Sequence, residues 1–366
     1  MTETSTSAAS PSPAFEPARA EAFAGRMVGI LNESFTAMMI SIGHQTGLFD
    51  LMSGLAPSTS EEIARAAGLN ERYVREWLGA LVVARILEYD APARRYRLPA
   101  EHAAFLTKAA RTNNLAAQMI MVSCMAEVEP KVIEAFRKGG GVPYSAYSRF
   151  TETMKVVSAE VFDDTLVQRT LPLIPGLVGR LESGIEVLDV GCGSGHAVNV
   201  MARAFPKSRF TGYDFSQEGV AAGLAEATAS GLENARFELV DVATLKDRER
   251  FDFITAFDAI HDQAKPRDVL AGIARALRKD GVFLMVDIRA SSKLEENLGH
   301  PMAPMLYSVS TLHCMTVSLA LEGEGLGTVW GEQKARELLS EAGFADPDVR
   351  QVEGDIINSY YITRLA

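Results

Sequence analysis

Three glycines at alternate positions follow an apolar run in residues 187–196, which read VLDVGCGSGH. A buried strand that enters such a turn lets backbone amides approach a ligand closely, and the start of the next helix favours a negative group. A second strand, expected over residues 208–213, leads to Asp214. An acid about twenty residues past the turn can accept hydrogen bonds from two ribose hydroxyls. The pattern therefore predicts a site for a nucleoside-bearing cofactor.

The glycine spacing separates two kinds of nucleotide site. A dinucleotide fingerprint requires glycine or alanine at its sixth position, where this chain has His196. The pattern Asp189-x-Gly191-x-Gly193-x-Gly195 instead resembles motif I of the class I S-adenosylmethionine-dependent methyltransferases. Three further strands are expected over residues 237–241, 251–258 and 281–287, in the order that this family shows.

The resemblance implies a fold and a cofactor. It predicts an α/β, Rossmann-like, seven-stranded domain over residues 185–366 whose last two strands are antiparallel, with S-adenosylmethionine as cofactor and S-adenosylhomocysteine as product. Asp214 matches the family's ribose-binding acid, and Asp241 matches the acid that holds the adenine amino group. The residues expected to bind the cofactor are Asp189, Gly191, Gly193, Gly195, Asp214, Phe215, Asp241, Val242, Phe257 and Tyr144.

Methyl transfer from a sulfonium is an in-line displacement, and a hydroxyl acceptor needs a base to take its proton. His261 follows the fourth expected strand, at the edge where open α/β sheets bind ligands. His261-Asp262-Gln263 resembles the His-Asp-Trp of plant-type O-methyltransferases, whose histidine is the general base. By the same resemblance Asp287 orients the imidazole. Gln263 replaces that family's tryptophan, and the alternative is a histidine that serves only as scaffold.

The first third of the chain predicts a winged helix over residues 19–110. Thr59 and Glu62 form a capping box, and Gly68 ends that helix. Asn70 caps a helix over residues 71–86, with an apolar face of Tyr73, Trp77, Leu78, Leu81 and Val82. A hairpin is expected to pair residues 86–89 with residues 95–98.

A winged helix can bind DNA or another protein chain. Residues 1–110 hold 10 Lys and Arg against 12 Asp and Glu, so they lack the basic field of a DNA reader. The only basic cluster is Arg94, Arg95 and Arg97. The order of motifs resembles the N-terminal domain of small-molecule O-methyltransferases, which joins two subunits and lines the substrate site. The whole chain resembles uncharacterised bacterial and mycobacterial winged-helix methyltransferases.

This resemblance favours a homodimer through the N-terminal domain. The expected dimer surface lies on an apolar helix over residues 33–46 and the segment after it. Its residues are Met38, Met39, Ile40, Leu48, Phe49, Leu51 and Met52. Alternatively, these side chains pack only inside their own domain.

Residues 111–184 are expected to form a helical linker and lid. Gly139–Gly141 and Pro143 exclude a helix interior and place Tyr144 and Tyr147 on a loop. The resemblance to the O-methyltransferases implies that this loop covers the cofactor and substrate. The alternative is a flexible connector whose tyrosines pack on the surface. An apolar, Met-rich helix over residues 300–321 lines the substrate site, or its side chains fill the core or a dimer contact. The expected substrate residues are Tyr147, Met305, Tyr307 and His313.

Composition bounds the remaining possibilities. The chain has 366 residues, a net charge of −11 and three separate cysteines without a CxxC pair, so we expect a cytoplasmic protein with no disulfide and no metal site. Residues 1–18 are expected to be a disordered tail, and no run is apolar enough to span a membrane. The predicted activity is O-methylation of a small molecule, with no nucleic-acid partner. The alternatives are a cofactor-sensing transcription regulator and an N- or C-methyltransferase.

Overall fold

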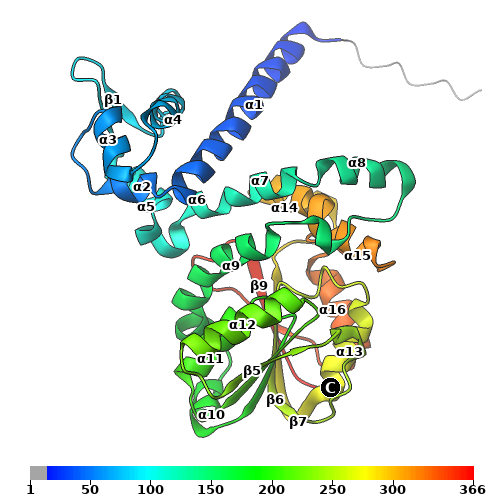
Figure 1. Ribbon diagram of the computed structural model, residues 1–366. Helices are drawn as coiled ribbons and strands as arrows, with labels where there is room; N and C mark the ends of the chain where they lie inside the picture. The colour runs from blue at the N-terminus through cyan, green and yellow to red at the C-terminus, as the bar shows by residue number, and fades with distance from the viewer. Residues whose placement is uncertain (1–14) are drawn as a thin grey trace, which may run out of the picture. The chain divides into compact units, whose positions relative to one another are not determined.

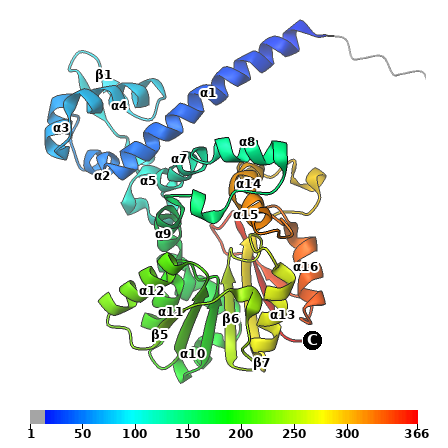
Figure 2. The same ribbon diagram turned by 45° about the vertical axis from the view of Figure 1, so that its right-hand side comes forward.

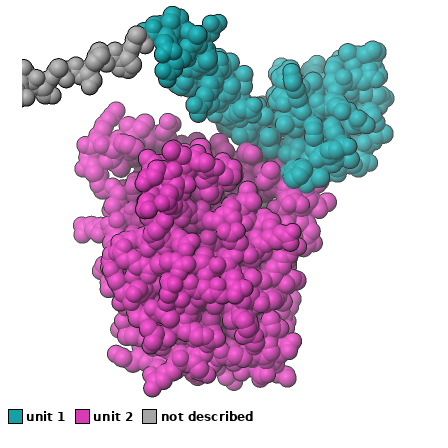
Figure 3. All heavy atoms as spheres, turned by 180° about the vertical axis from the view of Figure 1, so that it is seen from behind, with its two compact units in different colours: residues 1–106 teal, residues 107–366 magenta. Residues whose placement is uncertain are grey.

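The computed structural model describes residues 15–366, of which residues 151, 152, 156, 157 and 160 only by their backbone. Most of the tail expected over residues 1–18 therefore lies outside the described residues, and a helix already begins at Pro17. The chain divides into two compact units, Met1–Leu106 and Thr107–Ala366. Figure 1 shows their elements, and Figure 3 colours the two units separately.

The first unit consists of helices and one small hairpin. Its elements are α1 (Pro17–Gln45), α2 (Leu48–Ser53), α3 (Ser60–Ala67), α4 (Glu71–Val83), β1 (Glu88–Asp90), β2 (Arg95–Arg97) and α5 (Ala100–Leu106). The antiparallel β1–β2 pair is the predicted hairpin, with Tyr89 opposite Tyr96. Helix, turn, helix and hairpin in this order are the predicted winged helix.

The local signals at the starts of α3 and α4 are confirmed. Thr59 and Glu62 form both bonds of the capping box, and Gly68 ends α3 in the left-handed conformation. The side chain of Asn70 accepts from the amide of Arg72 at the start of α4. The prediction was wrong for one residue of the apolar face, because Tyr73 is 80% exposed and the neighbouring Val74 is buried instead.

Helix α1 is longer than the sequence predicted and leaves an apolar face uncovered. It begins at Pro17 rather than near residue 33. Its large exposed apolar side chains are Phe23, Met27, Val28, Ile30, Leu31, Phe35, Met38 and Ile42. By contrast, four residues expected on a dimer surface are buried within the unit: Ile40, Leu48, Phe49 and Met52. These four side chains pack inside their own unit, as the alternative had it, whereas Met38 of the predicted surface is exposed on α1.

The second unit is built on a seven-stranded sheet in the order β5-β4-β3-β6-β7-β9-β8. The first five of these strands are parallel, whereas β9 runs antiparallel to both β7 and β8. The strands are β3 (Glu186–Val190), β4 (Arg209–Asp214), β5 (Ala235–Leu239), β6 (Phe251–Phe257), β7 (Leu277–Ile288), β8 (Asp348–Arg350) and β9 (Asn358–Thr363). This confirms the predicted fold class.

Helices cover both faces of the sheet (Figure 2). Alternate residues of β7 point to opposite faces, as a strand requires. Leu284 belongs to one buried cluster with α10 (Leu177–Ser183) and α11 (His196–Ala204). Phe283 belongs to a second cluster with α13 (Pro266–Ala276) and α16 (Gly331–Glu341). Helix α12 (Gln217–Ala229) packs against β5 and β4. Strands buried on both faces explain their continuous apolar runs.

A run of short helices leads from residue 107 to the sheet. These are η1 (Lys108–Asn113), α6 (Leu115–Gln118), α7 (Ile120–Ala126), α8 (Glu129–Lys138), η2 (Tyr144–Ala146), α9 (Phe150–Val161), the π-helical η3 (Phe162–Thr170) and η4 (Leu171–Leu173). The helical run is interrupted at the predicted glycine segment, Gly139–Val142.

The Met-rich segment before α16 is one helical run with a π-helical turn inside it. It comprises α14 (Ala303–Val309), the π-turn η7 (Ser310–Cys314) and α15 (Met315–Ala320). Within residues 15–366, no helix combines the length and the apolar character needed to cross a bilayer. The three cysteines are free.

Candidate active site

The glycine turn and Asp214 meet at the carboxyl ends of β3 and β4. The Asp214 carboxylate accepts from the amide of Gly193 at 2.8 Å through Oδ2 and from the amide of Ser216 at 2.8 Å through Oδ1. The side chain is buried, with 7% exposed. Burial raises the pKa of Asp214, and the backbone hydrogen bonds partly offset this rise. The acid therefore fixes the turn that precedes α11.

The turn offers an open side to a ligand. Gly193 has φ +53°, and a Cβ placed on it would meet no heavy atom within 4 Å. A Cβ on Gly195, in contrast, would overlap the ring of Phe237, and one on Gly191 would lie 2.7 Å from Cβ of Ala259. Two glycines therefore serve packing, and Gly193 keeps one side of the turn clear.

The residues present fit a ribose at this edge. A carboxylate has about four acceptor positions. Two positions of Asp214 are occupied by the amides of Gly193 and Ser216, so others remain for ribose hydroxyls. Gly193 leaves space beside them. The free acceptor positions and the open side of the turn therefore fit the ribose of S-adenosylmethionine.

Asp189 lies inside the sheet rather than at its surface. It is 3% exposed, and its Oδ1 accepts from the hydroxyl of Thr255 in β6 at 2.7 Å. Burial raises the pKa of the Asp189 carboxyl to about 7, and the charge of Asp214 adds to the rise. Its contact with Thr255 joins β3 to β6 directly beneath the turn.

Three other expected cofactor residues line the same edge. Asp241 follows β5, is exposed, and accepts from the amide of Ala243 at the start of η5 (Val242–Thr244). The Val242 side chain belongs to the buried core, which leaves its backbone for any ligand. Phe257, at the end of β6, is half-buried and packs edge-on against Phe162.

His261 and Asp287 lie together, as predicted from their strand ends. The His261 Nδ1 lies 2.8 Å from Asp287 Oδ1. The same oxygen accepts from the indole of Trp330 at 2.9 Å and from the amide of Ile288 at 2.8 Å. His261 is 4% exposed and Asp287 is fully buried. Three donors on one oxygen fix the carboxylate, which in turn fixes the imidazole ring.

The electrostatics make His261 a strong base. Burial alone would lower its pKa, but the charge of Asp287 and hydrogen bonds to Asp287 and Cys314 outweigh burial. The pKa of His261 therefore lies well above its usual 6.5. A proton accepted at the ring nitrogen opposite Asp287 would be stabilised by that carboxylate.

Aromatic side chains connect the cofactor edge to the Met-rich helix. Tyr144 meets Phe215, the residue after Asp214, with ring centroids 5.6 Å apart. Tyr144 also meets His313 at 5.9 Å, and Tyr147 meets His313 at 4.8 Å. The structure thus brings two cofactor candidates and two substrate candidates into one cluster. Tyr147 and His313 are buried, whereas Phe215 is 50% exposed.

The glycine segment holds this cluster in place. A Cβ on Gly141 would overlap the carbonyl oxygen of Thr316 in α15. The next amide, of Val142, donates to the Thr316 hydroxyl at 2.9 Å, and the Tyr147 hydroxyl donates to the Leu312 carbonyl at 2.5 Å. The segment is therefore docked on the helix by its backbone, which answers the alternative of a loose connector with surface tyrosines.

The other two substrate candidates lie toward solvent on α14. Met305 is 42% exposed. Tyr307 is 37% exposed, and its hydroxyl accepts from Asn297 at 3.2 Å. His196, the first residue of α11, has Nδ1 2.7 Å from Glu226 and Nε2 3.1 Å from Asp163. Both of its nitrogens are therefore engaged by carboxylates.

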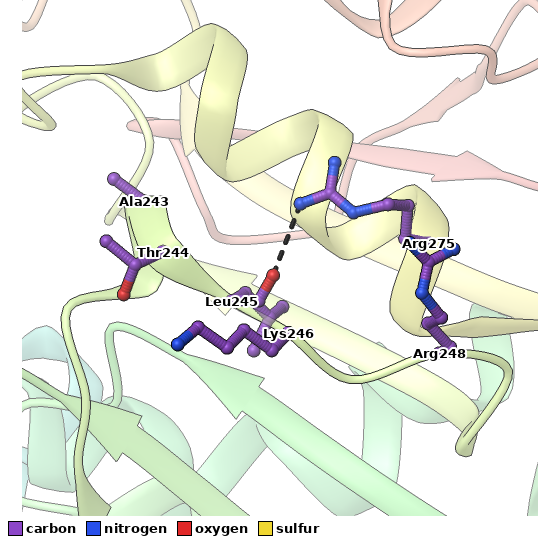
Figure 4. Close-up of a pocket in the computed structure, with 6 residues that line it drawn as sticks. All are labelled: Ala243, Thr244, Leu245, Lys246, Arg248 and Arg275. Atoms are coloured by element: carbon purple, nitrogen blue, oxygen red, sulfur yellow. Dashed lines mark hydrogen bonds between the residues drawn. The ribbon is translucent and has the colours of Figure 1, made fainter.

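A hollow of about 640 Å³ lies elsewhere, after β5 (Figure 4). It is lined by Ala243, Thr244, Leu245, Lys246, Arg248 and Arg275. Arg275 donates to the Leu245 carbonyl at 3.2 Å. None of the predicted site residues lines it, and its basic side chains lie on the surface. It therefore adds nothing to the chemistry above.

Sequence reasoning missed Trp330, Thr255 and Cys314. Trp330 and Thr255 hydrogen-bond the two acids that the motifs identified, and Cys314 helps to raise the pKa of His261. Thr255 could have been found from register, because it lies opposite Asp189 in the parallel β3–β6 pair. Nothing local marks the other two, which reach the site from α16 and η7.

Comparison with known families agrees with this geometry. Residues 34–108 match the Rv2258c-like winged HTH domain, and residues 181–343 match a methyltransferase domain. The chain therefore combines a winged HTH domain of this kind with a methyltransferase domain. The second match covers the glycine turn, Asp214, His261 and Asp287.

Curated relatives resemble part of the methyltransferase region. The chain is 30% identical over 114 residues to a phthiotriol/phenolphthiotriol dimycocerosates methyltransferase of Mycobacterium leprae, which covers 31% of this chain and 42% of the relative. It is 34% identical over 120 residues to the uncharacterized methyltransferase YcgJ of Bacillus subtilis, covering 31% and 46%. The matches thus span less than half the length of these relatives.

Solved structures share the fold along nearly the whole chain. The mitomycin 7-O-methyltransferase MmcR aligns with a TM-score of 0.69 at 18% identity, over 95% of this chain and 100% of that one. Human N-acetylserotonin methyltransferase, solved with S-adenosylmethionine, aligns with a TM-score of 0.69 at 19% identity, over 94% and 98%. At these identities the likeness concerns architecture.

Proposed function

We propose that this winged-helix methyltransferase transfers the methyl group of S-adenosylmethionine to a hydroxyl of a small molecule, with His261 as the general base. The observation that carries the proposal is the buried His261–Asp287 pair, 2.8 Å apart, at the same sheet edge as the glycine turn and Asp214. The mitomycin 7-O-methyltransferase named above, whose fold this chain shares, supports it.

The donor side rests on Asp214 and Gly193. When bound, S-adenosylmethionine supplies an electrophilic methyl on a sulfonium. Asp214 accepts from the ribose hydroxyls, and Gly193 leaves room beside the turn. Tyr144 and Phe215 close over the same end, and Asp241 receives the adenine amino group. Alignment of donor and acceptor supplies most of the acceleration.

The acceptor side rests on His261. A hydroxyl with a pKa near 10 is mostly protonated at neutral pH, so its proton has to move as the oxygen attacks. The His261 ring takes this proton, and Asp287 stabilises the imidazolium. Where His261 already carries a proton, the acceptor binds as its oxyanion beside the imidazolium. This oxyanion–imidazolium pair is the same one that forms when neutral His261 takes the proton of the hydroxyl. An amine acceptor would make less use of this pair.

The test measures donor binding and turnover separately. S-adenosylmethionine should bind in calorimetry, and Asp214→Ala should abolish binding. His261→Ala should keep the cofactor affinity and reduce turnover about 100-fold or more. NMR of the product assigns the methylated atom. Unchanged turnover in His261→Ala, or a methyl on nitrogen or carbon, would contradict the proposed role.

The proposed assembly is a homodimer joined through α1. Its exposed stripe of Phe35, Met38 and Ile42 repeats at helical spacing, as a helix–helix contact requires. Sedimentation should give twice the mass of 39.6 kDa. Substituting Phe35 and Met38 by Asp should give monomers, and an unchanged mass would contradict this surface.

A role in DNA binding has little support from the wing. Arg95 pairs with Glu62 at 2.9 Å, and Arg97 pairs with Glu88 at 2.5 Å. Two of the three wing arginines are thus already engaged by acids. A gel-shift assay at low salt should show no sequence-specific retention.

A further inference from the structure

His313 is a buried imidazole without a hydrogen-bond partner on either ring nitrogen, within the part of the chain that the structure describes. It is 1% exposed. Its ring stacks on Phe150 with centroids 3.8 Å apart and meets the edge of Tyr147 at 4.8 Å. A buried polar group left unpaired costs about 1–3 kcal/mol, so such groups call for an explanation.

The helix that carries His313 is attached to the segment that carries His261. Ser318 donates to the Gln263 carbonyl at 2.9 Å. The amide of Gly327 donates to the His261 carbonyl at 3.1 Å, and the amide of Thr328 donates to Ser310 at 3.2 Å. The neighbour of His313, Cys314, lies close enough to the His261 side chain to raise its pKa. The two imidazoles therefore belong to one site.

The backbone at His313 departs from an ordinary helix. Residues Ser310–Cys314 form a π-helical turn between α14 and α15. Such turns are frequent at functional sites. Here the turn carries His313 and Cys314 in succession. The Tyr147 hydroxyl also bonds this turn at the Leu312 carbonyl, so the aromatic cluster fixes its position.

The two imidazoles hold different numbers of protons. Burial, together with the charge of His261, lowers the pKa of His313 to about 3. His313 is therefore neutral at physiological pH, with one nitrogen as donor and one as acceptor. His261 has a raised pKa and takes protons. One ring is suited to proton removal and the other to hydrogen bonding only.

We propose that His313 hydrogen-bonds a second oxygen of the methyl acceptor, next to the hydroxyl that His261 deprotonates, and thereby selects acceptors with two neighbouring oxygen substituents. This inference rests on the proposed function. The imidazole N–H donates to the second oxygen, and no bond to His313 is made or broken. A site built to pair a polar group rejects analogues that lack it, because the site's own group then stays unpaired.

The test compares two matched probes on protein saturated with S-adenosylhomocysteine. The probes are 1,2-dihydroxynaphthalene and 2-naphthol, which differ by one hydroxyl, and calorimetry gives the two Kd values. We expect the diol to bind at least tenfold more tightly. His313→Phe keeps a ring for Phe150 and should reduce the ratio to about one, with the Kd of 2-naphthol and of S-adenosylhomocysteine unchanged. His313→Gln, which keeps a donor, should restore part of the preference.

A matched control and a spectroscopic signature separate binding from packing. His300→Phe, in the same unit, should keep the wild-type ratio. The ¹⁵N shifts of labelled His313 should move when the diol is added and stay in place with 2-naphthol. An unchanged ratio in His313→Phe would overturn the proposal, and so would failure of both probes to bind. If His313→Phe does not fold, the ratio in His313→Gln decides. Failure of the proposed function would instead appear as no binding of S-adenosylmethionine.

Discussion

The indole of Trp330 donates to the same oxygen of Asp287 that bonds His261, at 2.9 Å and 2.8 Å respectively. A residue at the start of α16 therefore orients the acid that orients the proposed base. Because Asp287 Oδ2 has no partner among the described residues, all of these hydrogen bonds are made by Asp287 Oδ1.

Trp330→Phe should weaken the site without removing any reacting group. It leaves Asp287 with one donor fewer, and a buried hydrogen bond to a charged group contributes about 1.5–3 kcal/mol. We expect a lower free energy of unfolding and a three- to tenfold lower kcat/KM, with unchanged affinity for S-adenosylmethionine. Trp77→Phe is the matched control, because it loses an indole bond to the Met39 carbonyl in the other unit. Equal losses of activity in both variants would count against a positioning role for Trp330.

The rate should depend on pH through His261. Because Asp287 raises the pKa of His261, the neutral ring is lost as the pH falls through a value above 6.5, and kcat/KM should rise with pH up to that value. Asp287→Asn removes the charge, so the rising part of the pH–rate profile should move to lower pH. The maximal kcat/KM should fall by about 100-fold. A pH–rate profile of both proteins is the measurement. A rising part that stays at the same pH in Asp287→Asn would exclude this pair as its origin.

Asp214→Asn should lower cofactor affinity and loosen the glycine turn. The carboxylate accepts from Gly193 and Ser216, and an amide can accept at only one of its two heavy atoms. We expect the Kd for S-adenosylmethionine to rise at least tenfold in calorimetry. Asp247→Asn, an acid bonded to Arg250 further from the turn, serves as control and should bind normally. Equal affinities for Asp214→Asn and wild type would remove Asp214 from the cofactor site.

Gly141→Ala should release the glycine segment from α15. The new methyl group would overlap the Thr316 carbonyl, so one backbone has to move. Gly140→Ala is a matched control, because Gly140 has φ +74° and open space, so its cost is about 1–2 kcal/mol of backbone strain alone. We expect Gly141→Ala to raise KM for the acceptor and to lower the thermal midpoint further than Gly140→Ala. A smaller effect in Gly141→Ala than in Gly140→Ala would contradict the docking.

Asp189→Asn should change how stability depends on pH. The pKa of Asp189 is about 7 in the folded protein and near 3.9 in the unfolded chain. The folded state therefore holds the proton more tightly, and its contribution to stability is present below pH 4 and lost as the pH rises to 7. Relative to wild type, Asp189→Asn should gain on the order of 2–4 kcal/mol between pH 4 and pH 7, measured by urea unfolding. A constant difference across this range would show that Asp189 is ionised throughout.

The sequence by itself determined the elements and the motif residues that end the strands. Glycine spacing, the capping box at Thr59 and Glu62, and apolar runs act within a few residues, where backbone geometry and hydrogen bonding decide the outcome. A parallel sheet then places the ends of β3, β4, β6 and β7 at one edge. That rule alone brought His261 near Asp287, and Gly193 near Asp214.

Only the tertiary structure decided which side chains complete the site. Trp330 meets Asp287, Gly141 meets Thr316, and His313 is enclosed by Phe150 and Tyr147 because separate elements pack together, and no periodic pattern records such packing. The burial of Val74 in place of the predicted Tyr73 has the same cause. Rotating the buried face of a helix by one residue changes its free energy little until neighbouring elements pack against it. Local patterns give the positions of groups along the chain, and close packing decides their partners.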